Sequence, residues 1–175
     1  SFPCALKANV ASAMAQLTLP GPDDVFVNLM SGSGSILIER RLLGQAAACI
    51  GIEYDPAHIL CARSNSSEAR LDGEAGWLQA DVRAIPLPAG CARALCADLP
   101  FGQRIGRHDE NVRLYPAVFA ETARIAGRGG RFVALSHEVQ LMNRVLREQR
   151  DWRTVQVLRL NLRGLHPRLY VLERV

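Results

Sequence analysis

The chain has 175 residues, of which 49% are hydrophobic and 22% charged, a composition typical of a globular domain and unlike that of a disordered chain. No apolar run approaches the roughly 18 residues of a membrane span, and Lys7, Asn9 and Gln16 interrupt the N-terminal region where a signal peptide would need an apolar core. The five cysteines are an odd number and contain no CxxC pair. We therefore expect reduced thiols, a cytoplasmic location and no metal site.

The net charge of +4 is unevenly distributed along the chain. Residues 1–97 carry seven basic and nine acidic side chains, whereas residues 98–175 carry fourteen basic and eight acidic ones. A basic second half is consistent with a polyanionic substrate, but the charge asymmetry alone favours an ordinary solvated basic face.

The first half of the sequence alternates between helix and strand patterns. Apolar spacings of three and four residues predict a helix over 5–17, which a Pro- and Gly-rich break ends before residue 25. Gly44 is placed as the residue that ends a helix, and Asp55 followed by Pro56 is typical of a helix start. We predict strands at 25–29, 46–52 and 76–79, and helices at 36–43 and from 55 to about 71.

The second half continues the alternation and ends in two strands. We predict a strand at 92–97, a loop at 101–114, a helix from Pro116 to about residue 126, a turn at 127–130, a strand at 131–135, a helix at 139–148, and strands at 155–162 and 169–173. Alternating elements predict an α/β fold with a mostly parallel sheet and helices on both faces. The last two strands lack an intervening helix, so they predict an antiparallel hairpin at the C-terminal edge of the sheet.

A glycine-rich segment, Met-Ser-Gly-Ser-Gly at residues 30–34, follows the first strand and precedes a helix. Such a loop lets the backbone approach a nucleotide-like ligand at a helix N-terminus. The third glycine of the dinucleotide fingerprint is replaced by Leu37, and the Gly-Lys-Ser/Thr of a P-loop is missing. Glu53 and Asp81 follow the second and third strands, where they can accept hydrogen bonds from ribose hydroxyls and an adenine amino group.

The strand at 92–97 ends in Asp-Leu-Pro-Phe-Gly at residues 98–102. Because Pro100 restricts the backbone before it, the Asp98 carboxylate and the Leu99 carbonyl should face one small space beside the Phe101 ring. Two acceptors next to a flat ring suit a planar group that bears an amine. Taken alone, this segment is also compatible with a simple strand end whose Phe101 belongs to the core.

Together these motifs resemble the S-adenosylmethionine-dependent methyltransferases, which have a Rossmann-like seven-stranded sheet. Within them, the chain is most similar to the catalytic domain of THUMP-containing tRNA guanine-N2 methyltransferases. The resemblance rests on the glycine loop, on an Asp-x-Pro-Phe-Gly-x-Arg-x-Gly run at residues 98–106, on Asn-x-x-Leu-Tyr-Pro at 111–116, and on a Gly-Leu turn before a Tyr-x-Leu strand. It covers nearly all of residues 1–175, which form one domain with 1–20 as a helical lead-in.

The resemblance implies methyl transfer from S-adenosylmethionine to an exocyclic amine, N2 of a guanine in tRNA. Asp98 and the Leu99 carbonyl would orient that amine, and Phe101 would stack on the base. The implied catalytic residues are Asp98, Leu99, Pro100 and Phe101; the implied cofactor-binding residues are Asn28, Met30, Ser31, Gly32, Ser33, Gly34, Glu53, Tyr54, Asp81, Val82 and Asp98; and the implied substrate-binding residues are Arg104, Asn111 and Tyr115.

The sequence departs from the family pattern in three ways. Asn28 stands where the family usually has Asp, Leu99 replaces a common proline, and we expect no THUMP domain within these residues, so RNA binding should be weak. Amino-methyltransferases that act on DNA adenine or cytosine, or on protein glutamine, share the same motif, and a non-catalytic scaffold is a further alternative. We assign both tryptophans to the core, and Glu39, Arg40 and Arg41 to a solvated helix face.

Overall fold

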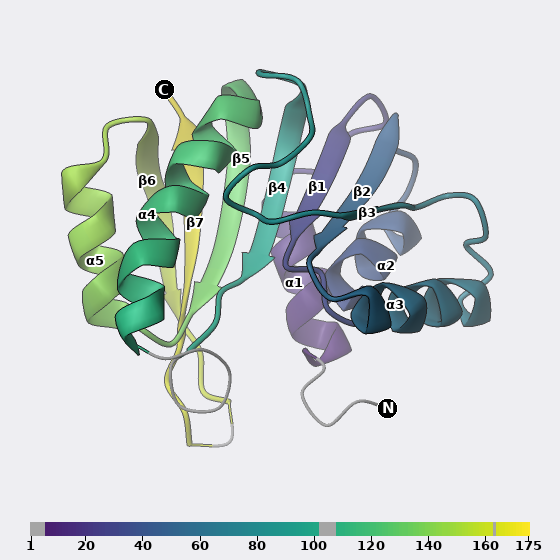
Figure 1. Ribbon diagram of the computed structural model, residues 1–175, viewed down its shortest axis with the longest axis horizontal. Helices are drawn as coiled ribbons and strands as arrows, with labels where there is room; N and C mark the ends of the chain where they lie inside the picture. Colours follow the sequence, from purple (N-terminus) through teal and green to yellow (C-terminus); the bar gives the residue numbers. More distant parts are fainter. Residues whose placement is uncertain (1–5, 102–107, 163) are drawn as a thin grey trace.

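The computed structural model, which describes residues 6–101, 108–162 and 164–175, is built around one seven-stranded sheet with the order β3-β2-β1-β4-β5-β7-β6 (Figure 1). The strands are β1 (Val25–Leu29), β2 (Ala48–Glu53), β3 (Gly76–Gln79), β4 (Ala92–Asp98), β5 (Ala126–Ser136), β6 (Trp152–Arg159) and β7 (Arg168–Arg174). The first five run parallel, and β7 is antiparallel to both β5 and β6. The predicted mixed sheet is therefore confirmed.

Helices cover both faces of the sheet. They are α1 (Ala8–Leu17), α2 (Ser35–Leu42), α3 (Pro56–Glu68), α4 (His108–Ile125) and α5 (Val139–Glu148). Val10, Met14 and Leu37 of α1 and α2 pack into one buried cluster, and Phe119 and Met142 of α4 and α5 into another, on opposite sides of the sheet (Figure 1). The Asp55 carboxylate accepts a hydrogen bond from the Ala57 amide (2.8 Å), which confirms the predicted start of α3.

Two predictions in the second half are wrong. α4 begins at His108 and not at Pro116, which lies inside the helix. Asp109 and Glu110 favour this earlier start, because acidic residues in the first turn interact well with the helix dipole. The 127–130 segment belongs to β5 and not to a turn, since β5 begins at Ala126 and its register against β4 shifts between Ala92 and Ala94.

Arg40 is buried and does not lie on a solvated helix face as predicted. Its guanidinium donates hydrogen bonds to the carbonyls of Gly21 (2.8 Å), Gln45 (3.1 Å) and Gly44 (3.2 Å), and Asp24 lies 3.8 Å away. The sequence shows only an amphipathic helix, whereas the burial follows from two loops that present carbonyls to the same point. Gly44 has a φ of 142° and follows the last residues of α2, as predicted.

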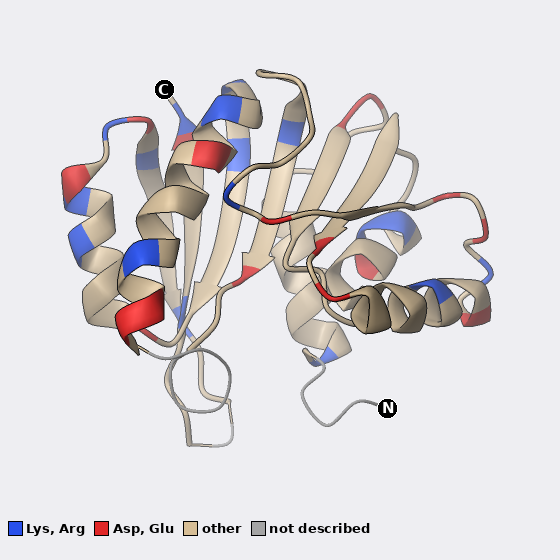
Figure 2. Cartoon of the chain, in the orientation of Figure 1, with Lys and Arg blue, Asp and Glu red and all other residues tan. Residues whose placement is uncertain are grey.

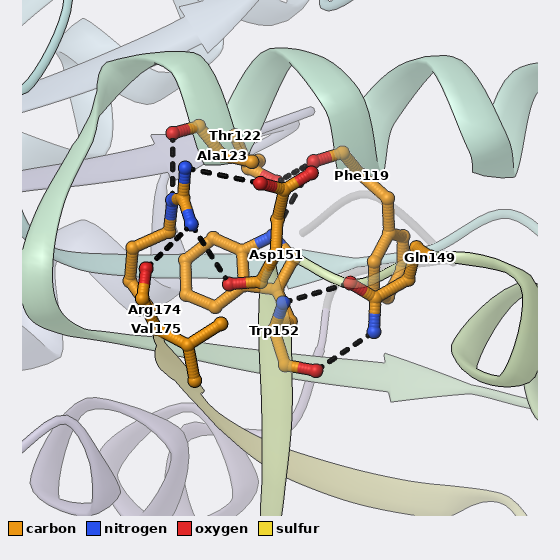
Figure 3. A network of polar contacts seen from close by, with 8 residues as sticks. All are labelled: Phe119, Thr122, Ala123, Gln149, Asp151, Trp152, Arg174 and Val175. Atoms are coloured by element: carbon orange, nitrogen blue, oxygen red, sulfur yellow. Dashed lines mark hydrogen bonds and ion pairs between the residues drawn. The ribbon is translucent and has the colours of Figure 1, made fainter.

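The C-terminal edge of the sheet is joined to α4 by a polar network (Figure 3). β6 begins three residues earlier than predicted because Trp152 is buried there, and its indole nitrogen donates to the Phe119 carbonyl (3.3 Å). Arg174 donates to the carbonyls of Ala123 (3.0 Å) and Asp151 (3.1 Å). The assignment of Trp152 to the core is confirmed.

Candidate functional site

The predicted ligand-binding residues lie at one edge of the sheet. The glycine loop follows β1, Glu53 ends β2, Asp81 follows β3 and Asp98 ends β4. Because β1 to β4 are parallel, their carboxyl ends meet at the lower edge in Figure 1. This is where open α/β sheets bind ligands.

The glycine loop has an unusual backbone. Met30, Gly32 and Gly34 all have positive φ angles, of 48°, 51° and 83°, and the Gly34 amide donates to the Ser31 carbonyl (2.8 Å). A Cβ built on Gly34 would lie 2.6 Å from the Trp77 ring, so this glycine lets the loop pack against β3. A Cβ on Gly32 would meet nothing within 4 Å, and the space above it is open.

Glu53 fastens the glycine loop to the end of β2. One carboxylate oxygen accepts a hydrogen bond from the Gly32 amide (2.8 Å), and the other accepts from the amides of Tyr54 (2.9 Å) and Asp55 (3.0 Å). The side chain is buried, so its orientation is fixed. The structure thus brings Glu53 and the loop together as predicted, and it gives Glu53 a structural task that the sequence did not reveal.

Asp81 is engaged by its own turn. Arg83 Nε lies 2.9 and 3.0 Å from the two carboxylate oxygens, and this hydrogen bonding lowers the pKa of Asp81. An adenine amino group would have to share Asp81 with Arg83. Val82 is buried beneath this turn, whereas Tyr54 is 74% exposed and offers its ring to a ligand beside Glu53.

Asn28 lies beneath the glycine loop and links two strands. Its Nδ2 donates to the carbonyls of Leu29 (3.2 Å) and Cys96 (3.3 Å), and its Oδ1 is buried without a hydrogen-bond partner in the described chain. A carboxylate in this place would face the same two carbonyl oxygens and repel them. The amide therefore suits these surroundings better than the expected Asp.

The edge of the sheet fits a nucleoside-like cofactor. The open space over Gly32 admits a ligand at the loop, and the buried Ser31 hydroxyl has no partner among the described residues. Glu53 supplies a fixed carboxylate and Tyr54 an exposed ring. Carboxylate and hydroxyl oxygens are the groups that bind ribose hydroxyls and polar ligand ends.

Asp98 stands apart from these groups because its carboxylate makes no hydrogen bond with any described residue. Burial raises the pKa of Asp98 to about 6. The next residue, Leu99, donates its amide to the Leu135 carbonyl (2.9 Å), and its own carbonyl accepts no hydrogen bond within the described ranges. Two acceptors, one of them a partly desolvated carboxylate, are thus left for a ligand.

The turn after Asp98 is held by the Pro100 carbonyl. This oxygen accepts hydrogen bonds from Asn111 Nδ2 (3.0 Å) and from the Tyr115 hydroxyl (2.8 Å). Both side chains are buried, and through these hydrogen bonds they position the turn; their expected contact with substrate stays a prediction. Burial raises the pKa of Tyr115, and the hydroxyl stays a donor.

A second layer of contacts holds Asn111 and Tyr115. Asn111 also donates to Glu138 Oε1 (2.7 Å), and the other oxygen of Glu138 contacts His108 Nδ1. Ser136 lies 2.9 Å from the Tyr115 hydroxyl and accepts a hydrogen bond from the Glu138 amide (3.1 Å). The turn is therefore supported by residues from α4 and from the end of β5.

An aromatic cavity of about 490 Å³ opens beside this turn. The Phe101 ring stacks on His137, with centroids 4.3 Å apart, and burial lowers the pKa of His137. Leu165 and His166 from the β6–β7 connection form the facing wall. The sequence reasoning missed His137, although its place just after β5, at the carboxyl end of a parallel strand, could have indicated it.

Some predictions concern residues that the structure does not describe. Arg104, and Gly102 and Gly106 on either side of it in the 98–106 run, fall in residues 102–107, which the structure does not describe. Within the described ranges, no group of three His, Cys, Asp or Glu side chains could hold a metal ion, and no helix is long and apolar enough to cross a membrane. Cys49, Cys61, Cys91 and Cys96 are free thiols.

The comparisons with known proteins identify the family and the fold of this chain. A tRNA (guanine(6)-N(2))-methyltransferase THUMP3 of Mus musculus is 31% identical over 98% of this chain, and a U6 snRNA (guanine-N(2))-methyltransferase THUMPD2 of the same species is 26% identical over 76%. The chain spans 37% and 24% of their lengths. The structure of TrmN from Thermus thermophilus superposes with a TM-score of 0.88 at 22% identity, covering 100% of this chain and 51% of TrmN.

The family described as the RMKL-like methyltransferase domain matches residues 1–168. This match and the relatives confirm the resemblance that the sequence motifs indicated, and TrmN confirms the fold. The chain therefore belongs to the RMKL-like methyltransferase domain family.

Proposed function

We propose that this domain transfers a methyl group from S-adenosylmethionine to the exocyclic N2 amine of a guanosine in RNA, with tRNA as the first substrate to test. The observation that carries the proposal is Asp98, a half-buried carboxylate with a raised pKa and no hydrogen-bond partner among the described residues. The relatives named as guanine-N2 methyltransferases support the base and the RNA.

The cofactor would lie across the glycine loop and the end of β2. Its ribose hydroxyls would reach Glu53, its adenine would lie near Tyr54, Asp81 and Val82, and its methionine end would lie over Gly32 and Ser31. The loop backbone at Met30, Ser33 and Gly34 would support this site, and the Asn28 side chain would support it from beneath the loop. When bound, S-adenosylmethionine supplies a methyl group activated by its sulfonium.

Asp98 and the Leu99 carbonyl would accept the two N–H bonds of the amine. This arrangement turns the nitrogen lone pair away from the base ring and toward the methyl group, and Asp98 stabilises the positive charge that develops on nitrogen. Orientation of two bound reactants lowers a barrier by about 7–11 kcal/mol in favourable cases. The methylated nitrogen then loses a proton readily, so no strong base is needed. A base in a helix must first leave its stack, at a cost of a few kcal/mol.

Methyl transfer from labelled S-adenosylmethionine to tRNA, DNA and protein tests the proposal. We expect labelled RNA with the parent chain and at least about a hundredfold loss for Asp98→Ala, because the carboxylate acts on the acceptor. Affinity for S-adenosylhomocysteine, measured by calorimetry, should stay near the parent value. Asp98→Asn should lose activity partly, because an amide accepts a hydrogen bond but carries no charge.

The aromatic ring provides a graded control. Phe101→Ala should cost less than Asp98→Ala, and Phe101→Tyr should be nearly neutral because a phenol stacks equally well. Full turnover in Asp98→Ala, or methylation of DNA or protein in place of RNA, contradicts the proposal. Absence of cofactor binding would instead identify a scaffold.

A further inference from the structure

The aromatic cavity does not end at the methyl-acceptor turn. A second hollow of about 410 Å³ lies along α5, and it shares His108, Gln140 and Leu141 with the first. Because three residues line both, the two hollows adjoin at His108. The contact of His108 Nδ1 with Glu138 fixes this side chain at the junction and leaves Nε2 for another partner.

The second hollow differs from the first in charge. Arg144 and Arg147 line it from α5, and both are exposed. They lie one turn apart on the same helix face, about 4.5 Å along the axis. Asn143 and Gln140 complete this face with neutral donors, and the only acidic residue of α5 is Glu148, at its end.

Arg144 and Arg147 have no acidic partner among the described residues, whereas several other arginines of this chain are held in ion pairs. Arg41 pairs with Glu74, Arg83 with Asp81, Arg124 with Glu121, Arg153 with Glu173 and Arg174 with Asp151. Figure 2 shows the two basic segments on the outer side of α5. Positive side chains without an ion-pair partner in the described chain thus line the hollow that adjoins the aromatic cavity.

We propose that this hollow is the path of the RNA strand next to the target nucleotide: the base enters the aromatic cavity, and adjoining phosphates bind Arg144 and Arg147. The inference rests on the proposed function and adds to it the surface that holds the substrate. Guanidinium groups bind phosphate with paired, charge-assisted hydrogen bonds. An unstacked base binds an aromatic surface, and the phosphates next to it must then lie close to that surface. The aromatic cavity can take the base, and the adjoining hollow can take the phosphates.

The test compares two double variants of the full chain that remove the same charge. Arg144→Ala/Arg147→Ala changes the path, whereas Arg63→Ala/Arg128→Ala removes two exposed arginines from α3 and from the start of β5, away from it. The probe is a fluorescein-labelled RNA hairpin with one unpaired guanosine. Fluorescence anisotropy gives its affinity at salt concentrations from about 50 to 200 mM, a range that includes physiological ionic strength.

We expect the path variant to lose on the order of tenfold in affinity at the lowest salt. The slope of log K against log salt should become shallower by about 1.4, because two single-strand phosphate contacts are lost. The matched variant should keep the parent slope. Arg144→Lys/Arg147→Lys should restore the slope, since lysine keeps the charge.

Equal losses in the two alanine variants, or no loss in the path variant, overturn the proposal. The proposal is also overturned if the parent does not bind RNA. It is likewise overturned if polyglutamate displaces the labelled RNA as well as unlabelled RNA does at the same concentration of negative charges. The outcome is separable from the proposed function, which Asp98→Ala tests by methyl transfer. If the path variant binds RNA like the parent while Asp98→Ala is inactive, the path is refuted and the function is not. If the path variant binds RNA more weakly but the parent transfers no methyl group, the function is refuted and the path is not.

Discussion

The two halves of the site differ in whether the protein itself forms hydrogen bonds to their carboxylates. On the cofactor side, Glu53 accepts three backbone hydrogen bonds and Asp81 is paired with Arg83. On the acceptor side, Asp98 is half-buried without a hydrogen-bond partner in the described chain, and its pKa is raised to about 6. The carboxylates of the cofactor side are thus hydrogen-bonded before any ligand arrives, and the carboxylate of the acceptor side is not.

This difference separates stability from chemistry. A carboxylate that holds its own backbone shapes a binding surface and stabilises the fold. A carboxylate without partners costs stability and is free for the N–H groups of a substrate. The turn beside Asp98 is nevertheless rigid, because Asn111 and Tyr115 fix the Pro100 carbonyl. The acceptor side therefore combines one unsatisfied group with a well-supported frame.

Breaking the cofactor side should have the largest effect on folding. Gly34→Ala places a Cβ 2.6 Å from the Trp77 ring at a φ of 83°, so we expect a loss of about 2–5 kcal/mol in the free energy of unfolding. Urea denaturation measures it. Gly32→Ala is the control: its φ is 51° but nothing lies within 4 Å, so only about 1 kcal/mol of backbone strain remains. Similar losses in both variants would show that close packing on Trp77 is unimportant.

Asp98→Asn should stabilise the fold at high pH. Since the pKa of Asp98 is raised from 3.8 to about 6, the folded state holds a proton that the unfolded state has lost, and stability falls as the pH rises between these values. Above pH 6, ionisation of Asp98 lowers the free energy of unfolding by about 3 kcal/mol, and asparagine avoids this loss because it carries no charge. Thermal melts should show the variant as more stable at pH 8 and equal to the parent near pH 4.

Asp81→Asn is the opposite case in the same experiment. Hydrogen bonding to Arg83 lowers the pKa of Asp81, so its contribution to stability is present above the unfolded pKa and is lost as the pH falls. Because the pair is near the surface, the loss at pH 8 should be below about 1 kcal/mol. If both variants shift stability in the same direction, the contrast between the two sides is wrong.

Cofactor affinity should depend more on Glu53 than on Asp81. Glu53→Ala removes the predicted ribose acceptor and also frees the Gly32 amide, so binding of S-adenosylhomocysteine should weaken by about 2 kcal/mol. Asp81→Ala should weaken it less, because Asp81 must first share its oxygens with Arg83. Calorimetry on both variants decides the order, and equal affinity of Glu53→Ala and the parent would place the ribose elsewhere.

The sequence predicted the sheet, the glycine loop and the strand ends well, because these follow from local patterns. Strands show as short apolar runs, and Asp55-Pro56 starts α3 through contacts within two residues. Prediction from the sequence failed where a feature depends on contacts between residues that are far apart in the chain. Arg40 is buried because Gly21 and Gln45 present carbonyls to it from separate loops.

The same limit explains the acceptor side. Pro116 favoured a helix start, although a proline can also lie inside a helix whose packing compensates for one lost hydrogen bond. With the helix starting at His108, Asn111 and Tyr115 donate hydrogen bonds to the Pro100 carbonyl, a supporting contact that the sequence pattern did not indicate. The stacking of His137 on Phe101 joins residues 36 positions apart, which no local pattern predicts.

The last prediction tests whether this supporting frame matters for turnover. Tyr115→Phe removes one of the two donors to the Pro100 carbonyl and leaves Asn111 in place, so the turn keeps its course but loses one hydrogen bond, worth about 1 kcal/mol. Steady-state kinetics with tRNA should show kcat reduced about fivefold and an unchanged affinity for S-adenosylhomocysteine. Tyr170→Phe is the control, because Tyr170 is equally buried but makes no hydrogen bond to Pro100. An unchanged kcat in Tyr115→Phe, in a protein whose Asp98→Ala form is inactive, would show that Asp98 works without the support of this turn.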